Sequence, residues 1–318
     1  MARLNISIPQ DLAPLVRKWR RKLNLSEICA SVLRDELAAV ESHRSALPIL
    51  RKLRRPNPLE LELVERFELH EAWVSNGEES DERQIRETLG KAAAEYLNQN
   101  LSEGCVLAIG GGRQAWCIVE HMSPRQIAMD IVALGYRQND PNLLNAHPNT
   151  LATVLWLLFS PRAKAWLIGN APNKTLNASA PVASGSRYFV VGSCAPFEAG
   201  SSLARLLGAS ATKSLVSRKA DGDFLYNFFN NDGLIIDLEI PGDRSILSAS
   251  ELGSLCERPD TKVVLVAGGE EKAGIIRKAV EAKLCNVLIT ETTAAQRLLG
   301  EKRPMASGIR SSRSAARS

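Results

Sequence analysis

The chain has 318 residues, of which 45% are hydrophobic and 24% charged, a globular composition with enough length for two domains. It has no run of about eighteen apolar residues, and its start, MARLNISIPQ, lacks the apolar core of a signal peptide, so we expect a cytoplasmic protein without a membrane segment. The net charge of +5 is uneven, because residues 1–58 hold 12 Lys/Arg against 5 Asp/Glu whereas residues 59–299 hold 23 against 29. This asymmetry indicates a polyanionic partner for the first segment alone.

The six cysteines are scattered along the chain, and none forms a C-x-x-C pair. Such a distribution favours reduced structural thiols in a cytosol over a disulfide framework or a zinc site. We therefore expect no metal ion.

Residues 3–8, RLNISI, alternate between polar and apolar side chains, which predicts a strand with one apolar face. Two helices are expected to follow, from Asp11 to about Leu23 and from Ser26 to about Val40, each with an apolar stripe. One strand and two helices cannot bury these faces alone. The simplest partner for the strand is therefore a second copy of the chain.

The strand–helix–helix pattern of residues 1–43 resembles the ribbon-helix-helix family, in which strands from two chains pair and enter the major groove of DNA. The resemblance implies double-stranded DNA as a partner and a homo-oligomer of at least two chains. It also implies that Arg3, Asn5 and Ser7 read base edges, because Arg suits guanine and Asn suits adenine. Ser26 and the backbone around it would hold a phosphate.

Other interpretations of the first segment stay open. The basic run that includes Arg17 and Arg21 can add electrostatic affinity for DNA, or it can be a solvated helix face. The two helices can form a helix-turn-helix, and the strand can be an edge strand of the main domain. Residues 44–58, basic and interrupted by prolines, read as a linker.

The main domain is expected over residues 59–299. Its first elements, read from apolar periodicity, are a helix at Leu59–Phe67, a strand at Glu71–Val74, a helix at Glu82–Asn100 and a strand at Val106–Ile109. A glycine turn follows the last of these strands and consists of Gly110, Gly111, Gly112, Arg113 and Gln114. Glycine amides and an arginine fork at the end of a strand suit a phosphate or a carboxylate.

The middle of the chain is harder to interpret. We expect helices at Pro124–Leu134 and Leu151–Phe159, and strands at Trp166–Gly169 and Tyr188–Val191, the last of which ends at Gly192. Further on, Asp221-Gly222-Asp223 precedes a cluster of aromatic residues. Asp223 can accept hydrogen bonds from sugar hydroxyls, and it can equally be a helix N-cap.

The stretch from Lys262 to Leu299 predicts a strand, a helix, a second strand and a last helix capped by Thr292 or Thr293. The two strands should be parallel, with a right-handed crossover. Gly268 and Gly269 form a second glycine turn, and Lys272 follows about one helical turn later. This turn also suits a phosphate, although the two glutamates after it oppose an anion, and a tight strand-to-helix connection explains it equally well.

Three blocks in this order resemble the sugar-binding domain of SorC/DeoR-type regulators: ELVERFELHEAWV with LGKAAAEYLNQNLSEGCVLAIGGGR, DGDFLYNFFNNDG, and AGGEEK with NVLITE. The resemblance implies a parallel-sheet α/β domain similar to sugar-phosphate isomerases. Gln114 departs from the family pattern, which has Ser or Thr there. The effector-binding residues implied for this chain are Gly110, Gly111, Gly112, Arg113, Gln114, Gly192, Asp223, Gly268, Gly269, Lys272 and Glu291.

The resulting hypothesis is a dimeric or tetrameric transcription regulator whose DNA binding responds to a small phosphorylated metabolite. It needs no catalytic residue, no cofactor and no membrane. Two alternatives are an isomerase-like enzyme and a DNA-binding scaffold, for example in the control of a mobile element, with a degenerate effector pocket. Residues 300–318, small, polar and basic, are expected to be a disordered tail.

Overall fold

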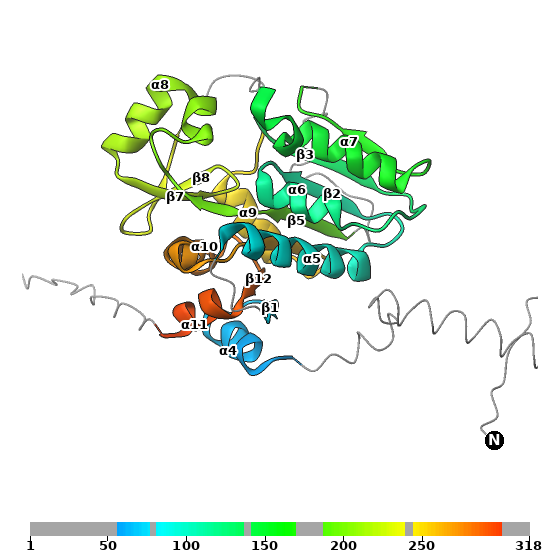
Figure 1. Ribbon diagram of the computed structural model, residues 1–318, viewed down its shortest axis with the longest axis horizontal. Coiled ribbons are helices and arrows are strands. Elements are labelled where there is room, and N and C mark those ends of the chain that lie inside the picture. Colours follow the sequence, from blue (N-terminus) through cyan, green and yellow to red (C-terminus); the bar gives the residue numbers. More distant parts are fainter. Residues whose placement is uncertain (1–55, 77–80, 137–140, 170–186, 239–243, 301–318) are drawn as a thin grey trace, which may run out of the picture. The chain divides into compact units, whose positions relative to one another are not determined.

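The structure is a computed structural model that describes residues 56–76, 81–136, 141–169, 187–238 and 244–300 (Figure 1). All of these residues belong to one compact unit that begins at Pro56. The expected ribbon-helix-helix segment and the basic tail lie outside the described residues. The same holds for the expected DNA-binding residues Arg3, Asn5, Ser7, Arg17, Arg21 and Ser26.

The central sheet has eight strands within the described part of the chain, in the order β1-β12-β11-β5-β2-β3-β10, with β4 paired to the start of β3. All neighbours are parallel except β10, which is antiparallel to β3. This confirms the predicted parallel α/β domain. The strands are β1 (Glu71–Ser75), β2 (Val106–Gly110), β3 (Asp130–Tyr136), β4 (Lys164–Trp166), β5 (Tyr188–Gly192), β10 (Arg244–Ser245), β11 (Thr261–Val266) and β12 (Val287–Glu291).

Helices cover both faces of this sheet (Figure 1). Every residue of β2, β5 and β12 is buried, which is why these strands are continuous apolar runs. One face packs on α5 (Glu82–Asn100), α6 (Arg113–Glu120) and α7 (Pro148–Phe159). The other packs on α4 (Pro58–Phe67), α9 (Ala249–Cys256), α10 (Ala273–Glu281) and α11 (Thr292–Gly300), and the short 3₁₀ helices are η1 (Pro141–Ala146) and η2 (Glu270–Lys272).

A second, smaller sheet is antiparallel and stands in the order β6-β7-β8-β9. Its strands are β6 (Cys194–Pro196), β7 (Ala220–Phe224), β8 (Asn227–Asn230) and β9 (Ile235–Ile236). Helix α8 (Ser202–Ser217), broken at Gly208, shares an apolar cluster with this sheet that includes Leu207, Leu215, Phe228 and Ile236. Helices α8 and α9 and the short helix α6 were not predicted from the sequence.

Two expectations need correction. The helix expected at Pro124–Leu134 is wrong, because β3 begins at Asp130 and continues to Tyr136. Its apolar run is buried between neighbouring strands, and a short apolar run does not distinguish a buried strand from a helix. The strand expected at Trp166–Gly169 lies earlier, at β4. Among the described helices, none combines the length and the apolar character that crossing a bilayer requires.

Candidate functional site

The first glycine turn, which follows β2, lies beside the turn at Gly192 and Ser193, which follows β5, because β2 and β5 are neighbours in the sheet. The next parallel strand after β2 is β3 on one side, whereas the next after β5 is β11 on the other side. The strand order therefore reverses between β2 and β5. A Cβ added to Gly112 would lie 3.9 Å from the Ser193 Oγ, so the two turns are adjacent. Open α/β sheets bind ligands in the crevice at such a reversal.

The first glycine turn presents the uncapped start of α6. Gly112 has a φ of 120°, and no side chain makes a capping hydrogen bond to this helix. The Gly112 N–H donates to the Ala146 carbonyl at 2.9 Å, so the open donors are those of the first helical turn beyond it. Arg113 begins the helix with an exposed side chain that makes no hydrogen bond or ion pair among the described residues. Open amides, the positive helix end and a free guanidinium together suit an anion.

Gln114 has a structural contact instead. Its Nε2 donates to the backbone carbonyl of Arg86 at 3.0 Å, which ties α6 to α5. The side chain that stands where the family has a hydroxyl residue therefore contacts α5 in this structure. Backbone amides and Arg113 remain as the polar groups of this turn.

Gly110 and Gly192 leave space for the tip of the β7–β8 hairpin. A Cβ would lie 2.6 Å from Leu225 Cδ2 at Gly110 and 2.5 Å from Leu225 Cγ at Gly192. Leu225 and Tyr226 form the tip with φ values of 49° and 67°, a region that side-chain-bearing residues rarely adopt. Close packing against Leu225 thus explains both glycines without a ligand, and it brings the hairpin to the strand ends.

Asp223 lies on β7, two residues before this tip, with only 7% of its surface exposed. Its Oδ2 accepts a hydrogen bond from the Tyr226 N–H at 3.0 Å. Burial raises the pKa of the Asp223 carboxyl to about 7, although this hydrogen bond opposes the change. Asp223 is thus part of a hairpin and not a helix N-cap. A buried carboxylate that still has acceptor capacity can bind hydroxyl groups.

Cys194 begins β6 and pairs with Phe224 of β7. Burial raises the pKa of its thiol to about 12, with a smaller contribution from the nearby Asp223. It is therefore a thiol near neutral pH and lacks the thiolate of a reactive cysteine. Within the described residues, no group of three or more His, Cys, Asp or Glu side chains is placed to hold a metal ion.

The second glycine turn is held by Glu291. Glu291 Oε1 accepts hydrogen bonds from the Gly269 N–H at 3.0 Å and the Ala294 N–H at 2.8 Å, and Oε2 accepts from the Thr293 N–H. The carboxylate of Glu291 therefore caps α11, a role that the sequence analysis gave to Thr292 or Thr293. Gly269 has a φ of 99°, which favours glycine.

Acidic side chains surround Lys272, which ends η2 in this turn. Lys272 Nζ lies 3.7 Å from Glu82 Oε1 and 3.9 Å from Glu271 Oε1. A Cβ on Gly269 would lie 2.5 Å from Glu271 Oε1, so this carboxylate covers the turn. An anion would meet less repulsion at the start of α6 than here. Lys272 can still reach a ligand, because both of its ion pairs are long.

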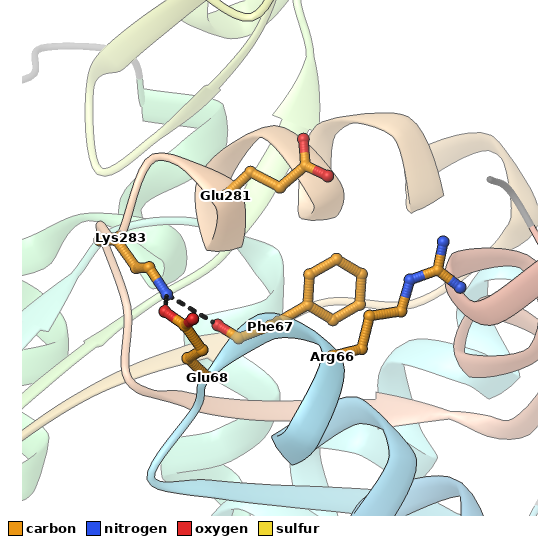
Figure 2. Close-up of a pocket in the computed structure, with 5 residues that line it drawn as sticks. All are labelled: Arg66, Phe67, Glu68, Glu281 and Lys283. Atoms are coloured by element: carbon orange, nitrogen blue, oxygen red, sulfur yellow. Dashed lines mark hydrogen bonds and ion pairs between the residues drawn. The ribbon is translucent and has the colours of Figure 1, made fainter. Parts of the chain in front are cut away.

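A small pocket lies elsewhere, at the carboxyl ends of α4 and α10 (Figure 2). Its lining residues are Arg66, Phe67, Glu68, Glu281 and Lys283. Lys283 Nζ donates to the Phe67 carbonyl at 3.1 Å and pairs with Glu68, so its charge is already engaged. The glycine turns precede α6 and α10, and this pocket is therefore separate from them.

The structure brings Gly110–Gly112, Gly192 and the Asp223 hairpin together, and it places Lys272 at the adjacent strand end. Leu225, Tyr226 and Arg86 were not predicted to contribute to this site. Two consecutive residues with positive φ have no sequence signal unless they are Gly, Asn or Asp. A hydrogen bond to the carbonyl of Arg86 leaves no sequence signal either.

A family model described as "Putative sugar-binding domain" matches residues 51–153 and 187–300, more than half of the chain. Among curated proteins, the "Deoxyribonucleoside regulator" of Bacillus subtilis (strain 168) is 26% identical over 259 residues, 75% of this chain and 78% of that protein. The "Transcriptional regulator LsrR" of Enterobacter sp. (strain 638) is 28% identical over 249 residues, 76% of this chain and 75% of that protein.

Solved structures agree on the fold. The full-length sorbitol operon regulator SorC from Klebsiella pneumoniae superposes with a TM-score of 0.59 at 17% identity, covering 92% of this chain and 100% of that chain. The probable sor operon regulator from Shigella flexneri gives 0.58 at 19% identity, covering 76% and 98%. The comparisons together confirm the resemblance to SorC/DeoR-type regulators that the three sequence blocks indicated.

Proposed function

The chain belongs to the family of the sugar-binding domain found in SorC/DeoR-type regulators, and we propose that it is a transcription regulator that binds DNA and responds to a phosphorylated sugar. In this proposal residues 1–43 bind operator DNA and the domain from residue 59 to 299 binds the effector. The observation that carries the effector part is the uncapped start of α6 at the strand reversal, with Arg113, whose side chain has no partner among the described residues.

Two groups recognise the two ends of the effector. The phosphate binds the first-turn amides of α6 and the guanidinium of Arg113, which offers a planar fork of donors. The hydroxyl groups bind the carboxylate of Asp223, which the β7–β8 hairpin carries to the same strand ends. Lys272, on the far side of β5, approaches as a point charge.

The two curated relatives, both named as regulators, favour a regulator over an isomerase-like enzyme. Two of the described histidines have structural roles. His147 Nδ1 accepts the Asn149 N–H at 3.1 Å and caps α7. His121 Nε2 lies 3.1 Å from Glu87 Oε1 on α5. Both imidazoles therefore have structural partners. The third described histidine, His70, is exposed at the start of β1, at the opposite end of the sheet from the glycine turns.

A thermal-shift panel on the full chain tests the effector site. The panel contains ribose 5-phosphate, 2-deoxyribose 5-phosphate, glucose 6-phosphate, fructose 6-phosphate, their parent sugars and inorganic phosphate. We expect at least one sugar phosphate to raise Tm, because a ligand that binds only the folded state stabilises it. Its parent sugar should raise Tm less.

Arg113→Ala should weaken this binding by roughly 10- to 100-fold, the loss of a hydrogen bond to a charged group. Arg187→Ala is the matched control, because Arg187 is also exposed but precedes β5 at the opposite end of the sheet. Equal loss in both variants contradicts the assignment of Arg113. If no compound raises Tm, the alternative of a DNA-binding scaffold without an effector is favoured.

A further inference from the structure

Glu60 is a buried carboxylate at the point where the described domain begins. It is 2% exposed and lies at the third position of α4. Its Oε2 accepts the Asn57 N–H at 2.8 Å, which completes a capping box. Its Oε1 accepts the Val74 N–H at 2.7 Å, which lies 14 residues further on in the edge strand β1. One carboxylate thus joins the first described residues to the sheet.

Strand β1, which carries Val74, pairs in parallel with β12. Val74 pairs with Thr290, and Ser75 pairs with Glu291. The Thr292 hydroxyl donates to the Ser75 carbonyl at 3.2 Å, which fixes the end of β1 to the start of α11. Figure 1 shows α4, β1, β12 and α11 grouped at one edge of the domain. The strand end next to Glu60 is therefore the strand end that carries the Glu291 cap.

The Glu291 cap in turn holds the second glycine turn. Its Oε1 accepts the Gly269 N–H, and Gly269 is followed by η2, a single 3₁₀ turn whose closing bond runs from the Lys272 N–H to the Gly269 carbonyl at 3.0 Å. Such short 3₁₀ turns are common where an α-helix begins, and η2 directly precedes α10. An anion that attracts Lys272 away from Glu82 and Glu271 would therefore displace this turn.

We infer that Glu60 couples the second glycine turn to Asn57, so that effector binding near Lys272 changes how the chain is held where the amino-terminal segment joins the domain. The inference rests on the proposed function, because it assigns the route by which the effector site reaches the DNA-binding segment.

The test measures amide hydrogen exchange by NMR in the full chain without any ligand. The reference is Ser248, whose N–H donates to Glu251 Oε2 at 2.8 Å in the capping box of α9, which matches that of Asn57 and Glu60. Glu291→Gln removes one acceptor charge from the Gly269 turn. We expect Asn57 and Val74 to exchange about tenfold faster relative to Ser248, as for the loss of one hydrogen bond to a charged group.

Lys272→Met perturbs the same turn with less risk to folding and should shift the ratio in the same direction. Adding Glu60→Gln should abolish the response of Asn57 to Lys272→Met, because an amide side chain keeps only one of the two acceptor oxygens. Adding Glu65→Gln, at an exposed residue of the same helix α4, should leave the response of Asn57 intact and does not touch the Ser248 reference. Unchanged ratios in both Glu291→Gln and Lys272→Met overturn the inference.

Unchanged exchange ratios are distinguishable from a failure of the proposed function. The exchange ratios need no effector, whereas the proposed function is tested by the Tm response to the sugar phosphates. A chain that shows the coupled exchange but no Tm response retains the coupling and loses the sugar-phosphate assignment. A chain with the Tm response but unchanged exchange retains the assignment and loses the coupling.

Discussion

Asp223, the proposed acceptor of the effector's hydroxyl groups, titrates in a range that links folding to pH. Its carboxyl is buried on β7, and burial raises its pKa to about 7 from an ordinary value of 3.8. A group whose pKa is higher in the folded state binds protons more readily there than in the unfolded chain. The free energy of unfolding should therefore rise as the pH falls from about 8 to about 4.

The size of this effect is on the order of a few kcal/mol, since each pKa unit corresponds to about 1.4 kcal/mol. We expect the midpoint of urea unfolding of the wild-type chain to rise over this range because of Asp223. In Asp223→Asn the side chain has no charge to lose, and this part of the pH dependence should vanish. Identical pH profiles for the two proteins would falsify the assignment.

The affinity for the effector should depend on pH in the opposite direction to the free energy of unfolding. Sugar hydroxyls donate to the ionised carboxylate, so affinity should fall as the pH drops below about 7. The phosphate group itself titrates near pH 6, so the informative quantity is the difference between wild type and Asp223→Asn in the same sugar-phosphate titration. The variant should bind more weakly at pH 8 and lose this additional pH dependence.

Residue identity predicted the site only in part. The sequence analysis brought out Arg113 because a strand, a glycine run and an arginine follow each other directly. It left Asp223 between a hydroxyl acceptor and a helix N-cap, and its position in a hairpin excludes the N-cap alone. Gln114 contacts a backbone carbonyl 28 residues earlier, at Arg86. Contacts of this kind depend on how two helices pack, and no local pattern encodes them.

At the scale of elements, the position of the β7–β8 hairpin tip depends on Gly110 at the end of β2 and Gly192 at the end of β5. Gly192→Ala places a Cβ 2.5 Å from Leu225 Cγ, so the tip must shift. We expect the free energy of unfolding, measured in urea, to fall by about 1–3 kcal/mol, as is usual for overpacking. The added substitution Leu225→Ala should recover part of this loss.

The control for this experiment is Gly253→Ala in α9. Nothing lies within 4 Å of a Cβ added there, and the residue is helical. The substitution should therefore stabilise the chain by roughly 0.5–1 kcal/mol. A destabilised Gly253→Ala, or a neutral Gly192→Ala, contradicts the packing argument.

Elements with strong local signals were predicted well. Helix α5 has the expected bounds, because its apolar spacing is regular and Asp81 caps its start through the Arg83 N–H. Strand β3 is buried along its length like β2 and β5, but its apolar run was assigned to a helix, because a short apolar run fits either element. Helix α8 is interrupted at Gly208, where φ is 82°, and such a break divides one helical pattern into two short ones.

For the whole molecule, the two segments that carry the two proposed activities have net charges of opposite sign. Residues 1–58 carry a net charge of +7 and residues 59–299 carry −6, counted as Lys/Arg minus Asp/Glu. The family match and the fold confirm the sugar-binding domain. The ribbon-helix-helix segment, the homo-oligomer and the DNA contacts stay predictions, because they depend on residues 1–55, outside the described part of the chain.

DNA binding by the full chain should fall steeply with salt concentration, because lysines and arginines that neutralise phosphates release counterions. Arg3→Ala or Asn5→Ala should cost about 1–3 kcal/mol of specific binding and relax base preference at one position. Binding to duplexes selected from a random library measures both effects. Arg187→Ala, in the sheet domain, should leave them unchanged, and a monomeric chain in sedimentation would refute the paired ribbon.

The pairing of β1 with β12 has a consequence for how the protein is made. These strands come from opposite ends of the domain, at Glu71–Ser75 and Val287–Glu291. During translation, β1 therefore has no partner strand until almost the whole domain has been synthesised. Contacts between residues this distant in sequence form slowly. An edge strand left open invites association with other chains. Nascent chains that terminate before β12 should therefore aggregate, and chaperones should bind them until translation is complete.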